Sequence, residues 1–375
     1  MKRRLNLTKK IHVLHVVTAL SWRGGEQQAA YLIGELEKEN IEQTVLCSSG
    51  SEMEKYCQKH SINNVSFPKR SSFSLSFSKA LSRLCKKLEI DLCHLHDAHA
   101  HTFAIIAASF FGNQTPLILS RRVDFPIRKS WASNYKYNHP AIKRILCVSE
   151  KIKEITSKGI AQKEKLVTVY SGIDLSKFKK TGKLRDELKL DEGIQLIGNT
   201  SALADHKDYF TFVDVAETVL EQKPNCIFPI FGTGPLEEEI KQYIQQKELD
   251  HKILLMGFRS DIPEVLGDLD VFLMTSKTEG LGTSVIDSFA AGVPVVSTNA
   301  GGIPELLEDC ITGILCEVKD VNCLSEGVLY LINNKEKISI IAQRAKEKAK
   351  RFSKEETAKK TLSIYLDVLK VKVWD

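Results

Sequence analysis

An acidic residue, a glycine loop and a second acid follow one another in residues 275–305, TSKTEGLGTSVIDSFAAGVPVVSTNAGGIPE. Glu279 opens the loop Gly280-Leu281-Gly282, and Asp287 lies eight positions after Glu279 in a helix pattern. Glycines let a backbone approach a ligand closely, and the amides of a helix N-terminus point at negative charge. Carboxylates accept hydrogen bonds from sugar hydroxyls. This combination suits a sugar nucleotide, with the diphosphate on amides and the hydroxyls on carboxylates.

The order of these residues resembles the donor-binding signature of retaining glycosyltransferases of family 4, which have the GT-B fold. That signature has a Glu, seven intervening residues, a second Glu and the run A-A-G-V-P-V-V, which stands here at residues 290–296. Asp287 replaces the second Glu and is one methylene shorter. An ordinary α/β unit with a glycine-rich turn is the alternative interpretation. The resemblance extends from the Gly24 loop to Gly301. Within the family, the chain resembles bacterial cell-envelope and lipopolysaccharide glycosyltransferases.

The resemblance implies an α/β protein with two Rossmann-like domains whose parallel sheets face across a cleft. The implied activity is that of a hexosyltransferase-type glycosyltransferase, retaining and independent of metal. Glu279 would hold sugar hydroxyls, Asp287 the ribose, Lys207 the leaving diphosphate and His99 the donor sugar. The implied donor-binding residues are Gly24, Gly25, Gly232, Gly234, Phe258, Gly280, Leu281, Gly282, Thr283, Ser284 and Asp287.

Two further glycine loops follow strand patterns. Gly24-Gly25 opens a helix expected from Gln27, an arrangement that suits an anion or a sugar but also serves as a tight packing turn. The turn 232–235, Gly-Thr-Gly-Pro, fails as a dinucleotide fingerprint because its third glycine is absent. It resembles the family's G-x-G-P loop beside the nucleotide. Phe258 lies in a similarly placed loop, where backbone groups could bind the base.

Ala202 marks a departure from the family. The family has an Arg five residues before the Lys that corresponds to Lys207, and the two cations together neutralise the leaving group. Arg121, Arg122 and Arg259 are the possible substitutes. A GT-B protein that binds a sugar nucleotide without transferring the sugar is therefore the alternative function.

Histidines are concentrated at His94, His96, His99 and His101. The spacing allows a metal site, because strand alternation places His94 and His96 on one face. A metal-binding protein built on this cluster is thus a third hypothesis, although neither Cys nor Glu completes a known pattern. The family carries a histidine here that binds the donor sugar, and His99 corresponds to it best, followed by His96.

Acceptor binding and metal use depend on two short motifs. Arg121 and Arg122 end a strand and suit an anionic acceptor, so they join His96 as tentative acceptor residues; salt bridges that fix the loop are the alternative. The D-x-D motif at 268–270 precedes a strand, and we interpret it as capping chemistry rather than a metal site. No metal site and no cofactor are therefore predicted. The expected donor is a UDP-sugar, with GDP- and ADP-sugars as alternatives.

The chain has a formal net charge of +6, and this charge is unevenly distributed between its two halves. Residues 1–178 carry 28 Lys and Arg against 15 Asp and Glu, whereas residues 179–375 carry 25 against 32. The basic half could contact a phosphate-bearing glycan or glycolipid acceptor or an anionic membrane, or it is simply a solvated surface. No nucleic-acid motif accompanies the charge, so no nucleic-acid partner is expected.

The nine cysteines form no C-x-x-C pair, which favours free thiols in a reducing compartment. No apolar run has the length of a membrane span, and the apolar stretch 11–20 fits a first strand better than a signal peptide. A cytoplasmic enzyme is expected, with the inner face of the cytoplasmic membrane as its possible site of action.

Short apolar strands alternate with helix patterns throughout the 375 residues, which predicts two α/β domains. The expected strands are 11–17, 43–47, 92–95, 117–120, 144–148 and 166–169 in the first half, and 195–199, 226–232, 253–256, 271–274, 293–298 and 313–316 in the second. We expect an acceptor-binding domain over 1–178 and a nucleotide-sugar domain over 179–354. A helix in 355–375 is expected to pack back toward the first domain. The stretch 71–78 is predicted to be a loop with two anchoring aromatic residues.

Overall fold

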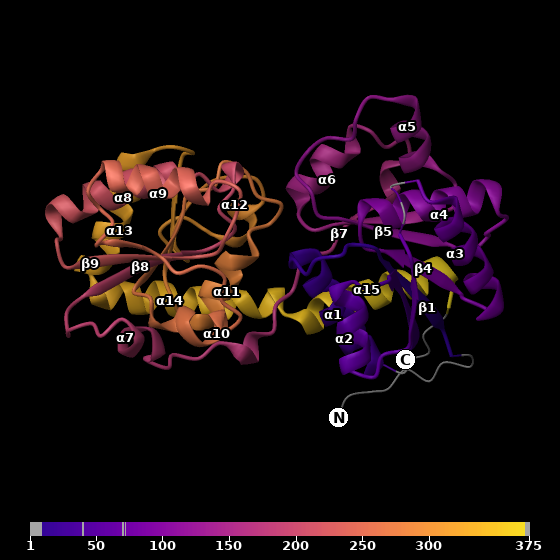
Figure 1. Ribbon diagram of the computed structural model, residues 1–375, viewed down its shortest axis with the longest axis horizontal. Coiled ribbons are helices and arrows are strands. Elements are labelled where there is room, and N and C mark those ends of the chain that lie inside the picture. Colours follow the sequence, from indigo (N-terminus) through magenta and orange to yellow (C-terminus); the bar gives the residue numbers. More distant parts are fainter. Residues whose placement is uncertain (1–9, 40, 70, 72, 372–375) are drawn as a thin grey trace. The chain divides into compact units, whose positions relative to one another are not determined.

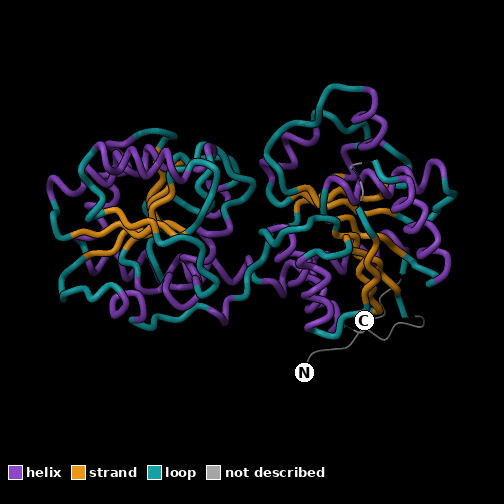
Figure 2. The backbone as a smooth tube through the Cα atoms, viewed as in Figure 1, coloured by secondary structure: helices purple, strands orange, loops and turns teal. Residues whose placement is uncertain are grey.

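The computed structural model describes residues 10–39, 41–69, 71 and 73–371 (Figure 1). The chain divides into two compact units. Unit 1 comprises Met1–Gly172 and Lys354–Asp375, and unit 2 comprises Ile173–Ser353. Each unit is a parallel sheet between layers of helices (Figure 2).

Unit 1 contains a seven-stranded sheet in the order β3-β2-β1-β4-β5-β6-β7, and its strands pair in parallel. Its central strands are short and apolar because both faces are covered by helices. The strands are β1 (His12–Val17), β2 (Glu42–Ser48), β3 (Asn64–Phe67), β4 (Leu92–Leu95), β5 (Leu117–Arg121), β6 (Ile142–Cys147) and β7 (Leu166–Thr168).

Helices cover the two faces of this sheet. They are α1 (Gly24–Glu37), α2 (Glu52–Lys59), α3 (Leu75–Lys87), α4 (Ala98–Phe110), α5 (Trp131–Asn138), α6 (Glu150–Ser157) and α15 (Lys354–Leu369). Cys93 contacts Cys85 of α3, whereas its neighbour His94 contacts Tyr365 of α15. Because successive strand residues point to opposite faces, α3 and α15 cover opposite sides. The C-terminal helix α15 packs beside α1 in the core of unit 1.

Unit 2 contains a six-stranded parallel sheet in the order β10-β9-β8-β11-β12-β13. The strands are β8 (Gln195–Thr200), β9 (Cys226–Phe231), β10 (Ile253–Leu255), β11 (Val271–Met274), β12 (Val295–Thr298) and β13 (Ile314–Cys316). The strand order reverses between β8 and β11. In open parallel sheets, ligands bind beyond the carboxyl ends of the strands at such a reversal.

The helices of unit 2 also form two layers. They are α7 (Lys183–Glu187), α8 (Tyr209–Gln222), α9 (Glu237–Gln246), α10 (Ile262–Val265), α11 (Thr283–Ala291), α12 (Ile303–Leu306), α13 (Val321–Asn333) and α14 (Lys335–Ala349). Helices α8, α9 and α13 share one apolar core with the sheet, while α11 packs against α14 on the other side (Figure 1). These layers leave the carboxyl ends of β8 and β9 free to carry loops.

Apart from the exact ends of elements, three predictions about the fold differ from the structure. Strand β3 had no counterpart in the sequence-based strands, since it is short and only partly buried. The expected loop 71–78 is half helical, because α3 begins at Leu75 with Ser74 as its N-cap; Phe77 is buried there, whereas Phe73 is exposed. The cysteines are not all free thiols: Cys316 is bonded to Cys323, since a short turn places their Cα atoms 5.7 Å apart. Cys47, Cys93 and Cys147 are free and buried, as predicted.

Across the described residues, each helix is either too short or too polar for the hydrocarbon thickness of a bilayer.

Candidate functional site

A pocket of about 380 Å³ lies at the carboxyl ends of β8 and β9 in unit 2. Its lining combines apolar and polar groups with one carboxylate. The residues are Thr200, Ser201, Ala202, Phe231, Gly232, Thr233, Phe258, Arg259, Ile262 and Asp287. The pocket thus lies on the side of the sheet reversal where parallel α/β folds bind nucleotides.

Two glycines allow the loops after β8 and β9 to touch. A Cβ on Gly232 would lie 2.0 Å from the carbonyl oxygen of Ser201, and one on Gly234 would lie 2.3 Å from that of Leu203. Hydrogen bonds from Leu203 N to Thr233 O and from Leu236 N to Leu203 O, 3.1 and 3.0 Å long, join the loops. The G-x-G-P turn therefore shapes the pocket wall through backbone packing.

Lys207 and Glu279 form an ion pair beside the carboxyl end of β11. The Lys207 Nζ lies 2.5 Å from Glu279 Oε1, and the two side chains are 14% and 10% exposed. Ser276 Oγ donates a second hydrogen bond to the same oxygen at 2.8 Å. The structure thus brings together two residues that are 72 positions apart in the chain.

The second glycine pair, Gly301-Gly302, packs against the backbone of the Glu279 loop. The amide of Gly302 donates to Glu279 O at 3.0 Å. A Cβ on Gly301, whose φ is +57°, would lie 1.9 Å from the same oxygen, and one on Gly302 would lie 2.5 Å from Gly280 O. These glycines are required because two backbone segments meet there.

The N-terminus of α11 presents uncapped amides. Gly282 is its N-cap with φ +89° and ψ 56°, and a glycine has no side chain to accept a hydrogen bond from the first turn. Thr283 and Ser284 begin the helix directly after the loop 280–282. Such a terminus attracts an anion through its amides and its partial positive charge.

Asp287, one turn further along α11, lines the pocket without a hydrogen-bond partner among the described residues. Burial raises the pKa of its carboxyl to about 7. An isolated carboxylate at a pocket wall is a ready acceptor for ligand hydroxyls, because no protein group competes for its lone pairs.

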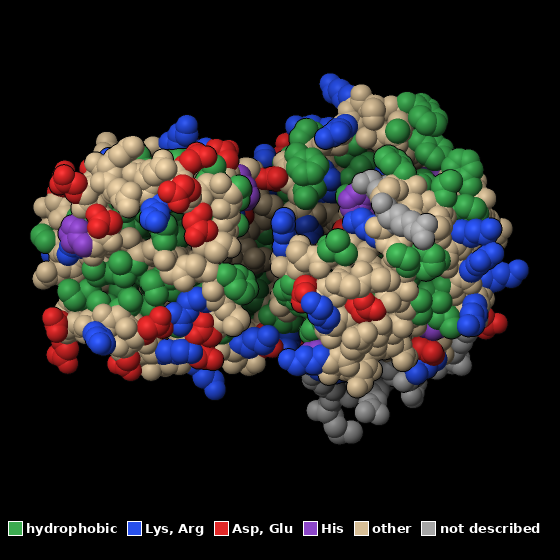
Figure 3. Space-filling model, in the orientation of Figure 1, with side chains coloured by type: hydrophobic (Ala, Val, Ile, Leu, Met, Phe, Trp, Pro, Cys, Tyr) green, Lys and Arg blue, Asp and Glu red, His purple; other side chains and the backbone are tan. Residues whose placement is uncertain are grey.

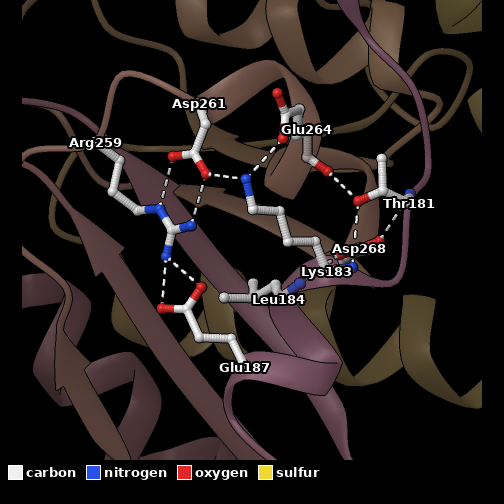
Figure 4. Close-up of polar contacts among 8 residues, drawn as sticks. All are labelled: Thr181, Lys183, Leu184, Glu187, Arg259, Asp261, Glu264 and Asp268. Carbon is white, nitrogen blue, oxygen red and sulfur yellow. Dashed lines mark hydrogen bonds and ion pairs between the residues drawn. The ribbon is translucent and has the colours of Figure 1, made fainter.

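Arg259 lines the pocket and belongs to a network of ion pairs and hydrogen bonds, which Figure 4 shows. Its guanidinium donates to both oxygens of Glu187 at 2.8 Å and to both oxygens of Asp261 at 2.9 and 2.8 Å. Lys183 bridges Asp261 and Glu264 at 2.7 Å each. The Arg259 guanidinium, together with Lys183, holds the pKa of the Asp261 carboxyl well below its usual range.

The network joins α7 to the loop after β10 (Figure 4). Phe258, the residue before Arg259, is 78% exposed at the pocket edge. The D-x-D carboxylates have related structural partners. Asp268 accepts the amides of Gly182 and Leu184 at 2.8 and 2.9 Å, and Asp270 pairs with Arg185 at 2.6 Å. Both residues therefore anchor α7, which matches the predicted capping role.

Ala202 lines the pocket, and the three proposed substitute arginines have protein partners. Arg259 is held by two carboxylates. In unit 1, Arg121 is buried and donates to Tyr137 Oη at 2.9 Å and to Phe125 O. Arg122 donates to His96 O at 3.0 Å, and burial lowers the pKa of its guanidinium to about 10. All three guanidinium groups therefore already donate hydrogen bonds within their own unit.

In unit 1, the Gly24-Gly25 loop is the first turn of α1, which begins earlier than predicted. Added Cβ atoms at both glycines would meet open space. Glu26 accepts the Arg23 amide at 2.9 Å and so caps the helix. The two glycines are therefore not demanded by packing, in contrast to Gly232 and Gly301.

Asp97 joins two loops of unit 1, and sequence reasoning missed it. Its carboxylate caps α4 by accepting the amides of His99 and Ala100, each at 2.9 Å. It also accepts the Thr18 amide and hydroxyl at 2.5 and 2.7 Å. Asp97 thus positions His99, the half-buried second residue of α4. An acidic residue just before a helix pattern is the signal that could have found it.

His15, His94 and His96 form a buried cluster under α15. His15 Nδ1 lies 3.0 Å from His96 Nε2, and the rings of His94 and His96 are 4.1 Å apart, which confirms their predicted common face. His94 also contacts Tyr365 Oη and Ser120 Oγ at 2.5 and 2.8 Å. Burial lowers the pKa of His15 to about 4 and depresses those of His94 and His96 well below the usual value.

This cluster differs from the predicted one, since the buried His101 contacts Lys136 O at 3.1 Å and His99 begins a helix. Within the described part of the chain, His15, His94 and His96 are the set whose ligand atoms approach closely enough to hold a metal. Neutral imidazoles suit zinc, but the positive Arg122 lowers the pKa values of His94 and His96 and would oppose a cation. The observed hydrogen bonds make this cluster part of the core of unit 1.

Comparisons with known proteins identify the two units. The sequence profile of the family described as Glycosyltransferase Family 4 matches residues 22–177, and that of Glycosyl transferases group 1 matches residues 180–351. A similar curated protein is the N-acetyl-alpha-D-glucosaminyl L-malate synthase of Bacillus anthracis, 24% identical over 324 residues, with 84% of each chain covered. Another is the Escherichia coli UDP-Gal:alpha-D-GlcNAc-diphosphoundecaprenol alpha-1,3-galactosyltransferase, 25% identical, with 77% of this chain and 79% of the relative covered.

Solved structures agree on the fold. Anabaena HepE, solved in complex with UDP and glucose, has a TM-score of 0.83 at 20% identity, with 95% of this chain and 100% of that chain covered. A Rickettsia africae glycosyltransferase has a TM-score of 0.85 at 20% identity, covering 97% and 100%. With matching profiles over both units and this fold, the chain belongs to the family 4 and group 1 glycosyltransferases of the GT-B fold.

Proposed function

We propose that this glycosyltransferase moves a hexose from a UDP-sugar to a hydroxyl of a glycan or glycolipid in envelope polysaccharide or lipopolysaccharide synthesis. The observation that carries the proposal is the unit 2 pocket of about 380 Å³, whose lining includes the Asp287 carboxylate of α11. The N-terminus of the same helix and the Lys207–Glu279 pair belong to the segments that follow β11 and β8. The setting is supported by relatives such as the Escherichia coli galactosyltransferase named above, whose name gives alpha-D-GlcNAc-diphosphoundecaprenol as its acceptor.

In the proposed mechanism, charge developing on the leaving diphosphate is the main barrier. Lys207 and the amides of Thr283 and Ser284 would stabilise that charge from fixed positions, which costs no reorganisation during the reaction. Asp287 would accept the ribose hydroxyls, Phe258 would contact the base and Glu279 would hold sugar hydroxyls. His99 is the unit 1 residue that we assign to the donor sugar, with Asp97 as its support.

The Lys207–Glu279 pair suggests the sequence of events when the donor binds. Without donor, Glu279 neutralises Lys207 at 2.5 Å. A bound diphosphate would compete for the ammonium group, and the released carboxylate oxygen would then be available to sugar hydroxyls. Transfer would proceed without a metal ion, because lysine and amides supply the positive charge. Retention of anomeric configuration is proposed from the resemblance of residues 279–296 to the retaining enzymes of family 4.

The proposal is tested by thermal unfolding with UDP, GDP, ADP and CMP, each with and without magnesium. A ligand at about 100 times its Kd adds about 2.7 kcal/mol to the free energy of unfolding, so its effect is readily seen. We expect UDP to stabilise the protein with or without magnesium. NMR of the product anomer then tests retention, and inversion or a strict magnesium requirement would contradict this mechanism.

A protein that binds the donor without transferring the sugar is the second candidate, and Ala202 in the pocket wall favours it. The three candidate arginines are engaged elsewhere in the described structure, so one phosphate cation of the family pattern has no evident replacement. Stabilisation by UDP without hydrolysis or transfer, across glycan and glycolipid acceptors, would support this candidate over the enzyme.

A further inference from the structure

Exposed aromatic side chains gather over α4 and α5 of unit 1. Trp131 is 80% exposed and Phe110 is 76% exposed. The Trp131 ring stacks on Tyr135 with centroids 5.6 Å apart, and Tyr135 Oη lies 2.9 Å from Ser109 Oγ, next to Phe110. These contacts join the three aromatic residues into one surface. Hydrophobic side chains cover this part of unit 1 in Figure 3.

Cations surround these rings. A groove of about 480 Å³ runs beside Trp131, and its charged lining residues are Arg128, Lys129 and Lys158. No carboxylate is among its described lining residues, and Arg128 and Lys129 are exposed. Between residues 98 and 149 the sequence has seven Lys and Arg but one acid, Asp124. The neighbouring helix α3, which packs on α4, has four Lys and Arg and no acid.

This mixture has the chemistry of a bilayer contact. Aromatic rings with polar edges favour the headgroup layer of a membrane, and lysine and arginine are attracted to anionic lipid phosphates. Exposed apolar groups of this size in a water-soluble unit generally indicate an interaction site. The rings project from separate elements among exposed lysines, whereas the centres of protein–protein interfaces are depleted of lysine.

We propose that unit 1 docks on an anionic lipid bilayer through a surface formed by Phe110, Trp131, Tyr135, Arg128 and Lys129, called here the aromatic–basic surface. The rings enter the headgroup layer, and a lipid phosphate enters the groove lined by Arg128 and Lys129. The proposal rests on the proposed function in one respect, since a glycolipid acceptor explains why a transferase would need a membrane. It specifies which face of unit 1 makes the contact.

The test uses the full chain and co-sedimentation with vesicles of phosphatidylcholine, with or without phosphatidylglycerol. We expect binding to the anionic vesicles and its loss at high salt, because the charge attraction is screened. The double variant Phe110→Ser, Trp131→Ser is expected to bind about tenfold more weakly. Each of Arg128→Gln and Lys129→Gln should weaken binding about fivefold.

Matched controls come from α14 of unit 2. Ile340 is 51% exposed and Lys346 is exposed, so Ile340→Ser and Lys346→Gln remove the same kinds of group from a different surface. Both should bind vesicles like the unchanged protein. Equal binding to neutral and anionic vesicles, equal losses in the controls, or binding that survives all four substitutions in the aromatic–basic surface would each overturn the proposal. So would capture by an acidic polypeptide but not by anionic vesicles.

UDP stabilisation measured on the same variants separates the two proposals. The substitutions in the aromatic–basic surface lie in unit 1, outside the donor pocket. UDP should therefore stabilise each of these variants as it does the unchanged protein. Vesicle binding without any UDP effect would retain the docking surface and reject the proposed donor. UDP stabilisation without vesicle binding would do the reverse.

Discussion

Both units are built on a parallel sheet, but the polar side chains near the strand ends differ between them in how far protein atoms already bind them. In unit 1, His15, His94, His96 and Arg121 are buried and contact one another or nearby protein atoms. In the described part of unit 2, Asp287 has no hydrogen-bond partner, the N-cap of α11 is a glycine without a capping side chain, and the Lys207 ammonium group pairs with Glu279. Buried polar groups held mainly by protein atoms stabilise a core, although His96 Nδ1 and Arg121 Nε lack a partner among the described residues, whereas groups left available can bind a ligand.

Gly301→Ala is expected to give the largest effect on this comparison. The new Cβ would lie 1.9 Å from Glu279 O at a φ of +57°, so the Glu279 loop must move. We expect a loss of about 3–5 kcal/mol in the free energy of unfolding and loss of UDP binding. Urea unfolding and UDP-dependent thermal shifts measure both.

Gly25→Ala is the control from unit 1, where an added Cβ meets open space in α1. Alanine should leave stability unchanged or raise it by up to about 1 kcal/mol, because it favours the helix. Equal destabilisation by the two substitutions would contradict the distinction between a glycine demanded by packing and one that is not.

Lys207→Ala should be the next largest change. It leaves the Glu279 carboxylate, in a side chain 10% exposed, without its cation. We expect a loss of about 2–3 kcal/mol in the free energy of unfolding and a fall in kcat of about 100-fold. Lys277→Ala is the matched control, since its partner Asp205 is 83% exposed; it should cost less than about 1 kcal/mol and keep kcat. Similar effects on kcat would remove Lys207 from the mechanism.

The two units should respond oppositely to acid. Burial depresses the pKa values of His15, His94 and His96, so the unfolded state binds more protons and the stability of unit 1 falls as pH drops below about 6.5. Burial raises the pKa of Asp287 to about 7. The folded state of unit 2 therefore binds the extra proton between about pH 4 and 7, and this contribution to stability is lost as pH rises through that window.

Tryptophan fluorescence can report unit 1, because the described tryptophans, Trp22 and Trp131, lie in it and residues 173–353 contain no tryptophan. We expect a loss of about 3–4 kcal/mol in unit 1 between pH 7 and 5.5, because each of the three histidines contributes about 1.2 kcal/mol. Hydrogen exchange of unit 2 amides should show Asp287→Asn abolishing the opposite trend there. Parallel pH profiles for both units would contradict the contrast. UDP affinity should also rise above pH 7 in the unchanged protein but not in Asp287→Asn, since the ionised carboxylate is the better acceptor.

Ala202→Arg should produce the smallest effect. A guanidinium at the pocket wall would add a charge-assisted hydrogen bond to the diphosphate and strengthen UDP binding about tenfold. Calorimetry with UDP measures the gain, and Ala202→Gln controls for side-chain size. Weaker binding in the arginine variant would show that another group already occupies the phosphate position.

Much of the fold could be predicted from sequence because parallel strands buried on both faces are continuous apolar runs. Strands β4 and β11 have the predicted bounds, Leu92–Leu95 and Val271–Met274. Partly buried β3 has no such run and was missed. The Cys316–Cys323 bond was missed because a pairing depends on the distance between two Cα atoms, which spacing alone does not give.

Sequence by itself determined which chemical groups this transferase has: the acids Glu279 and Asp287, the glycine loops and Lys207, in an order shared with a known family. Only the tertiary structure decided which of them are available. Gly232 and Gly301 are required by backbone contacts, Arg259 is held by Glu187 and Asp261, and the tentative acceptor residues His96 and Arg121 are buried. The reason is physical: residue type fixes what a side chain can bind, but its neighbours in space decide whether a partner has already been found.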